Sequence, residues 1–116
     1  MEHLTAGLHA AGVPVHVQSR CDALVTASDG RVIGAVASTL DGEIRIRAIR
    51  GVVLAAGGFI HNEGMVDRYA PQLARCKMKV GTENDDGLGI RLGLAAGGEA
   101  IRLVVGFFCF GSNGRR

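Results

Sequence analysis

Two short segments of the 116-residue sequence combine residue types that suit the binding of a nucleotide. The first is an apolar run, residues 52–56, followed at once by Gly57 and Gly58. Small residues at the end of a buried strand let a ligand approach the backbone closely, and the exposed amides there can donate to phosphate or ribose oxygens. The alternative is an ordinary turn after a strand, in which the glycines only supply positive φ angles.

The second segment, residues 81–90, places carboxylates just before an expected helix. Asp85 or Asp86 can cap that helix by accepting hydrogen bonds from its free amides. The same carboxylate can accept hydrogen bonds from ribose hydroxyls. Taken alone, capping is the simpler interpretation. A calcium loop is not expected, because Glu83, Asp85 and Asp86 lack the required spacing and the terminal glutamate.

The other side chains that could do chemistry have no partner at a useful spacing. The four histidines show no metal-ligand spacing, and residues 61–63 (HNE) do not begin a zinc-protease motif. Cys21, Cys76 and Cys109 are odd in number and form no CxxC pair. No GxSxG elbow is present, and no GxGxxG opens a predicted helix. We therefore expect no metal site, no redox set of cysteines and no catalytic residue within this chain.

Composition narrows the class of protein further. Apolar residues make up 47% of the chain, which is enough for one small hydrophobic core. A net charge of +2 and 4% aromatic residues give no sign of a nucleic-acid partner. The longest apolar runs are too short to cross a membrane, and the N-terminus lacks the pattern of a signal peptide. The unpaired cysteines favour a reduced, cytoplasmic location.

Hydrophobic spacing predicts the elements that must position these segments. Helices are expected at residues 2–11, 63–69 and 87–96. Residues 23–27, 31–39 and 43–49 are predicted to form an antiparallel meander, with turns at 28–30 and 41–42. Residues 13–17 alternate like a short strand. Residues 51–56 are continuously apolar, as in a strand buried on both faces.

Together, these features resemble the fumarate reductase/succinate dehydrogenase flavoprotein superfamily, and within it the branch that contains 3-ketosteroid dehydrogenases and soluble fumarate reductases. The resemblance covers Leu4 to about Leu103. The family pattern A-T-G-G-F-x-x-N appears as residues 55–62 (AAGGFIHN), and N-x-G-D-G appears as residues 83–87 (ENDDG). Asp85 stands where the family has glycine, and we expect its replacement by glycine to be tolerated.

The resemblance implies an α/β fold: part of a Rossmann-like FAD-binding domain over residues 1–110, with a parallel core strand, a β-meander and helices. Residues 111–116 are expected to be a frayed tail. In this family the protein wraps an extended FAD. The residues implied to contact it are Cys21 (through its backbone), Ala55, Ala56, Gly57, Gly58 and Asp86.

The family's phosphate-binding glycines and substrate cap are not found in this sequence, so we expect an interior fragment that is inactive alone. The intact protein would transfer hydride between a C–C bond of a small-molecule substrate and flavin. The substrate and the oligomeric state are not specified by the sequence. The alternative is a non-catalytic α/β module that has lost its cofactor. A nicotinamide-binding domain is disfavoured, because the meander interrupts the required alternation of strands and helices.

Overall fold

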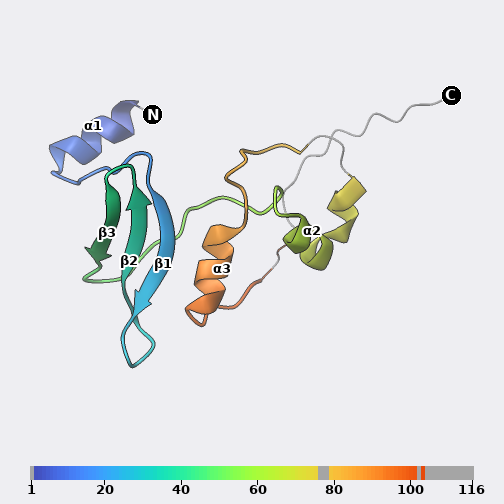
Figure 1. Ribbon diagram of the computed structural model, residues 1–116. Helices are drawn as coiled ribbons and strands as arrows, with labels where there is room; N and C mark the ends of the chain where they lie inside the picture. Colours follow the sequence, from blue (N-terminus) through green and yellow to red (C-terminus); the bar gives the residue numbers. More distant parts are fainter. Residues whose placement is uncertain (1, 76–78, 102, 104–116) are drawn as a thin grey trace.

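The computed structural model describes residues 2–75, 79–101 and 103, and these form a mixed α/β arrangement (Figure 1). The elements in chain order are α1 (Glu2–Ala10), β1 (Arg20–Thr26), β2 (Val32–Thr39), β3 (Gly42–Arg47), α2 (Glu63–Tyr69), the 3₁₀ helix η1 (Pro71–Arg75) and α3 (Leu88–Ala95). The α/β class expected from the sequence is confirmed. No helix among the described residues has the length and hydropathy needed to cross a bilayer.

The three strands form the predicted antiparallel meander, in the order β1-β2-β3. The β1–β2 turn closes because Gly30 has a φ of 83° and its amide donates to Ala27 O at 2.9 Å. Asp29 supports the same turn, since its Oδ1 accepts from the Arg31 amide at 3.0 Å. In the central strand β2, Ala37 is buried.

The main hydrophobic cluster lies in the helical part of the molecule. Its buried members are Phe59, Ile60, Met65, Val66 and Ala70. Helix α2 begins where the sequence predicts, because the Asn62 side chain accepts a hydrogen bond from the Met65 amide at 3.1 Å. The cap sets the start of α2 directly after Phe59 and Ile60, which pack against Met65 and Val66 of the helix.

The strand predicted at residues 51–56 is not formed. The segment is extended, but Val53 is 91% exposed and Leu54 is 38% exposed. A strand needs a neighbour that satisfies its backbone amides and carbonyls, and no strand runs beside this segment among the described residues. The parallel core strand expected here is therefore wrong for this structure. The short strand expected at residues 13–17 is also absent.

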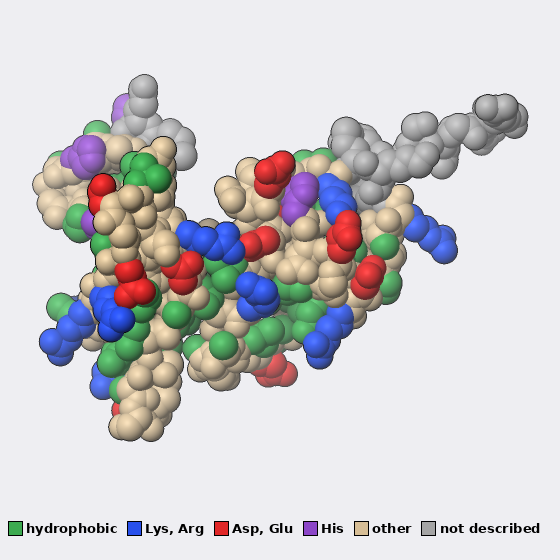
Figure 2. Space-filling view, viewed as in Figure 1, with side chains coloured by type: hydrophobic (Ala, Val, Ile, Leu, Met, Phe, Trp, Pro, Cys, Tyr) green, Lys and Arg blue, Asp and Glu red, His purple; other side chains and the backbone are tan. Residues whose placement is uncertain are grey.

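Figure 1 shows the sheet and α1 on one side of the molecule, with α2 and α3 on the other. The extended segment between β3 and α2 crosses from one side to the other. Acidic and basic side chains meet where the two sides approach each other (Figure 2). This meeting region holds a cavity that both sides of the molecule line.

Candidate functional site

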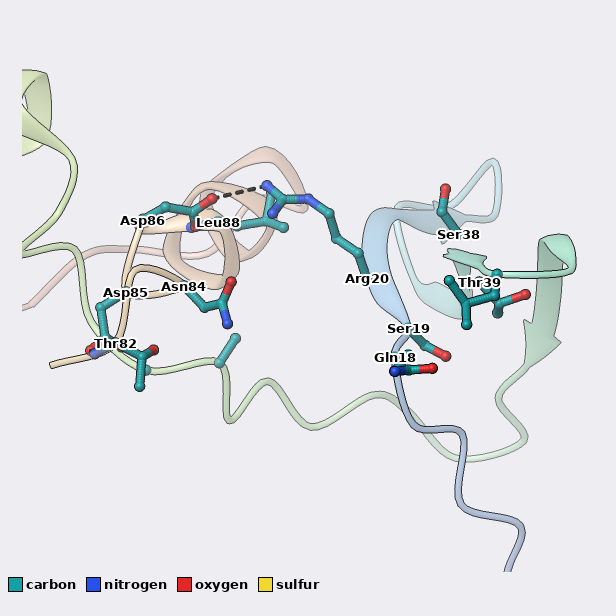
Figure 3. Close-up of a pocket in the computed structure, with 13 residues that line it drawn as sticks. Gln18, Ser19, Arg20, Ser38, Thr39, Thr82, Asn84, Asp85, Asp86 and Leu88 are labelled. Carbon is teal, nitrogen blue, oxygen red and sulfur yellow. Dashed lines mark hydrogen bonds and ion pairs between the residues drawn. The ribbon is translucent and has the colours of Figure 1, made fainter.

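The cavity has a volume of about 730 Å³, within the usual range of about 300–1,000 Å³ for small-molecule sites. Its sheet-side lining comes from residues 18–20, where β1 begins, and from residues 38–40, where β2 ends. The other wall is formed by Ala56, Gly57, Leu88 and residues of the loop 82–86 (Figure 3). Segments far apart in the sequence thus meet around one hollow.

An ion pair spans the cavity from β1 to the start of α3. Arg20 Nη2 donates to Asp86 Oδ2 at 2.9 Å, as drawn in Figure 3. On the sheet side, Arg20 Nε lies 3.9 Å from Asp22 Oδ1, and Ser38 Oγ donates to the other oxygen of Asp22 at 2.6 Å. The Arg20 side chain is 54% exposed, so solvent screens the pair and its effect on stability is small.

Asp86 uses its two carboxylate oxygens in different ways. While Oδ2 takes the guanidinium of Arg20, Oδ1 accepts from the Leu88 amide at 2.8 Å in the first turn of α3. The Arg20 hydrogen bond, followed by the Leu88 amide, holds the pKa of Asp86 below its ordinary value. Asp86 is therefore ionised at neutral pH. The predicted capping contact is present, although Asp86 stands one residue before the N-cap residue Gly87.

The backbone conformation of Gly57 and its contact with Asp85 both favour glycine at this position. Its φ is 72°, and a Cβ built on it would overlap Oδ1 of Asp85. The Gly58 amide donates to that same oxygen at 3.2 Å, while the Gly58 carbonyl accepts from the Gly87 amide at 2.9 Å. A larger side chain at Gly57 would therefore meet the Asp85 carboxylate.

Ala56 also has a packing reason to be small. A Cβ at Gly89 in α3 would lie 2.8 Å from the Cβ of Ala56, so the first turn of α3 lies directly against this residue. Ala56 therefore faces both the helix and the cavity. A larger side chain here would push α3 away and narrow the cavity at the same time.

Three of the six residues implied to bind cofactor line the cavity, namely Ala56, Gly57 and Asp86. Ala55 and Gly58 flank those residues in the chain without lining it. Cys21 lies in β1 opposite Ala37, and its thiol is free. Cys76, Cys109 and the tail expected at residues 111–116 fall outside the described residues.

The cavity is also lined by polar residues that were not among the six implied to bind cofactor: Gln18, Ser19, Arg20, Ser38, Thr39, Thr82 and Asn84. Arg20 directly precedes Cys21, but nothing local pairs it with an aspartate 66 residues away. No three His, Cys, Asp or Glu side chains gather as a metal-ligand set in the part of the chain that the structure describes.

The sequence and the fold of this chain are both similar to those of known flavoproteins. Residues 1–112 match the family described as "FAD binding domain". Over 92 residues the chain is 41% identical to a 3-oxosteroid 1-dehydrogenase of Mycolicibacterium smegmatis. This alignment covers 75% of this chain and 16% of that protein.

Solved structures give the same result. One is the 3-ketosteroid-Δ4-(5α)-dehydrogenase of Rhodococcus jostii RHA1 in complex with 4-androstene-3,17-dione, with a TM-score of 0.73 and 37% identity, over 81% of this chain and 19% of that chain. Another is the open conformation of a flavocytochrome c3 fumarate reductase, with a TM-score of 0.70 and 27% identity, over 82% of this chain and 17% of that chain. The chain thus spans less than a fifth of each of these proteins.

Proposed function

Because this chain belongs to the FAD-binding domain family, we propose that the cavity between β1 and α3 holds part of an FAD molecule. The observation that carries the proposal is the position of Asp86. Its ionised carboxylate lines a cavity whose neighbouring wall, Ala56 and Gly57, has almost no side chain. Such a wall admits a ligand close to the backbone, and the carboxylate can accept from one of its hydroxyls.

The residues present fit such a ligand. A carboxylate offers about four lone-pair directions, and Asp86 has two hydrogen-bond partners, Arg20 and Leu88. Acceptor capacity therefore remains for a ribose or ribityl hydroxyl. Arg20 carries five N–H donors and gives one to Asp86, so it can also pair with a phosphate that enters the cavity.

We propose further that the full-length protein is an FAD-dependent oxidoreductase acting on a C–C bond of a small-molecule substrate. FAD, when bound, supplies the hydride acceptor or donor. In this chain Asp86, Arg20 and the backbone at Ala56 and Gly57 bind and orient the cofactor. The names of the relatives support hydride transfer to or from a ketosteroid-like or fumarate-like substrate, and this step would use parts of the protein beyond this chain.

A second candidate is a module of the same fold that has lost its cofactor. The observation in its favour is that the Gly58 amide and both oxygens of Asp86 already have partners within the protein. Flavin content separates the two candidates: the full-length protein, purified in the presence of FAD, retains it only under the first.

The test is an FAD titration of the full-length Asp86→Asn variant. Asparagine preserves a capping oxygen but loses the charge and presents a donor on one side. Losing a charged hydrogen bond should cost about 1.5–3 kcal/mol, which weakens FAD binding about tenfold to hundredfold.

The matched control is Glu43→Gln. This change breaks another exposed ion pair, Glu43–Arg45, which has the same 2.9 Å separation but lies outside the cavity. FAD affinity should not change in this variant. If Asp86→Asn binds FAD as the wild type does, Asp86 is only a helix cap.

A further inference from the structure

The carboxylate of Asp85 joins two segments that are far apart in the sequence. Its Oδ1 accepts from the Gly58 amide at 3.2 Å, and its Oδ2 accepts from the Thr82 amide at 3.1 Å. The first segment contributes Gly57 to the cavity, and the second contributes Thr82. One side chain therefore holds two parts of the cavity wall in register.

The main chain of Asp85 is fixed as well. Its amide donates to Thr82 O at 2.9 Å, and its carbonyl accepts from the His61 amide at 3.1 Å. The residue is half-buried between these contacts. A side chain on so restrained a backbone loses little further freedom when its carboxylate takes the two amides, so the geometry is preorganised.

Two glycines are matched to this carboxylate. Gly57 has a φ of 72° and Gly81 has a φ of 151°, and a Cβ on either would overlap an oxygen of Asp85. The absence of side chains at both positions therefore lets the Asp85 carboxylate reach the Gly58 and Thr82 amides. The three residues form one unit, which we name the Asp85 clamp: Gly57, Gly81 and Asp85.

We propose that Asp85 is a positioning residue for the cofactor cavity, which it serves by clamping the segment at Gly57 to the segment at Gly81. This inference rests on the proposed binding of FAD to that cavity. The expectation that Asp85→Gly would be tolerated is accordingly replaced by its opposite.

The test is a graded series at position 85 in the full-length protein, with FAD as the titrated ligand. Asparagine keeps one acceptor oxygen but turns an NH₂ group toward the second amide, so it retains one of the two contacts. Glycine retains neither. We expect Asp85→Gly to weaken FAD binding about tenfold, and Asp85→Asn to fall between the glycine variant and the wild type.

A destabilised control separates positioning from a general loss of stability. Val66→Ala removes buried volume from the hydrophobic cluster without touching the cavity lining. It should lower the apo melting temperature, yet leave FAD affinity unchanged when the titration is run well below that temperature. The Asp85 variants should lose affinity under the same conditions.

A double-mutant cycle tests the match between Gly57 and Asp85. Gly57→Ala should greatly weaken FAD binding in the wild-type background, because its Cβ displaces the carboxylate. In the Asp85→Gly background the same change should have a much smaller effect, since the obstructing oxygen is gone. Gly12→Ala is the control for strain alone, because Gly12 has a φ of 66° with nothing within 4 Å of its Cβ position.

The outcomes are distinguishable. If the wild-type protein binds FAD and Asp85→Gly binds it equally well or more tightly, the positioning role is wrong while the proposed function stands. Independent effects of Gly57→Ala and Asp85→Gly would also overturn the clamp. If the wild-type protein shows no saturable FAD binding, the proposed function fails, and the positioning role fails with it.

Discussion

Asp86 accepts a hydrogen bond on each carboxylate oxygen, one from the β-sheet side and one from helix α3. Arg20 provides the first and the Leu88 amide provides the second. Capping could be predicted from the sequence, because it depends on residues two apart. The pairing with Arg20 could not, because it depends on how the chain folds between two residues that are 66 positions apart. The same limit applies to Asp85, whose partner Gly58 is 27 residues away.

The lowered pKa of Asp86 predicts a pH dependence of folding. A carboxyl whose folded-state pKa is depressed contributes stability above its unfolded pKa of about 3.9, and this contribution is lost as the pH falls through the folded value. Asp86→Asn removes the contribution. The difference in unfolding free energy between wild type and variant should therefore be largest above about pH 4 and should shrink below it.

Urea unfolding of the apo full-length protein at a series of pH values measures this difference. A gap between wild type and Asp86→Asn that stays constant down to the lowest pH would mean that the folded protein does not stabilise the ionised carboxylate.

At the scale of elements, the sequence was most informative where hydrogen bonds are local. The meander was predicted because its strands are neighbours in the sequence and its turns carry Gly30 and Gly42, which have φ angles of 83° and 123°. Helix α2 was predicted with its cap at Asn62. The apolar residues 51–56 gave a false strand, because apolarity shows that a segment suits burial but not that a partner strand lies beside it.

The N-cap residue of helix α3 occupies a position that only glycine fits. Gly87 has a φ of 76°, and a Cβ there would overlap Met65 Sδ and lie 2.9 Å from Phe59 Cβ. Gly87→Ala should destabilise the protein by about 2–4 kcal/mol, which combines backbone strain with overpacking of the cluster. Chemical denaturation of the apo protein gives the value.

The matched control lies at the opposite end of the same helix. Gly97 has a φ of 90°, but nothing lies within 4 Å of its Cβ position. Gly97→Ala should therefore cost only the strain, about 1–2 kcal/mol. Equal costs at the two positions would show that the contacts of Gly87 with Met65 and Phe59 do not limit the side chain.

At the scale of the whole molecule, burial is sparse. Among the described residues, the buried hydrophobic side chains are those of Ala37 and the five-residue cluster around Phe59, and no helix packs extensively on the sheet. Large apolar side chains remain exposed, such as Leu4 at 73%, Ile49 at 90% and Val53 at 91%. The extended segment 51–56 also has no strand beside it among the described residues. These surfaces are suited to contacts with further polypeptide, in keeping with relatives that are more than four times longer.

We therefore expect the 116-residue chain on its own to catalyse no turnover and to unfold with low cooperativity. A small core supplies little of the free energy needed to offset chain entropy. Among the described residues, two carboxylates line the cavity, those of Asp85 and Asp86. Both accept hydrogen bonds from backbone amides, and Asp86 also pairs with Arg20. Neither is therefore placed as an acid or base for a substrate. Two measurements on the isolated chain check this: anaerobic flavin reduction with a 3-ketosteroid, and thermal unfolding followed by circular dichroism.

Hydrogen exchange supplies the comparison with the full-length protein, in which the amides of residues 52–55 should become protected if that segment gains a neighbouring strand. Flavin reduction by the isolated chain, or equal exchange of those amides in both forms, would show that the chain needs no further polypeptide to complete its fold and its site.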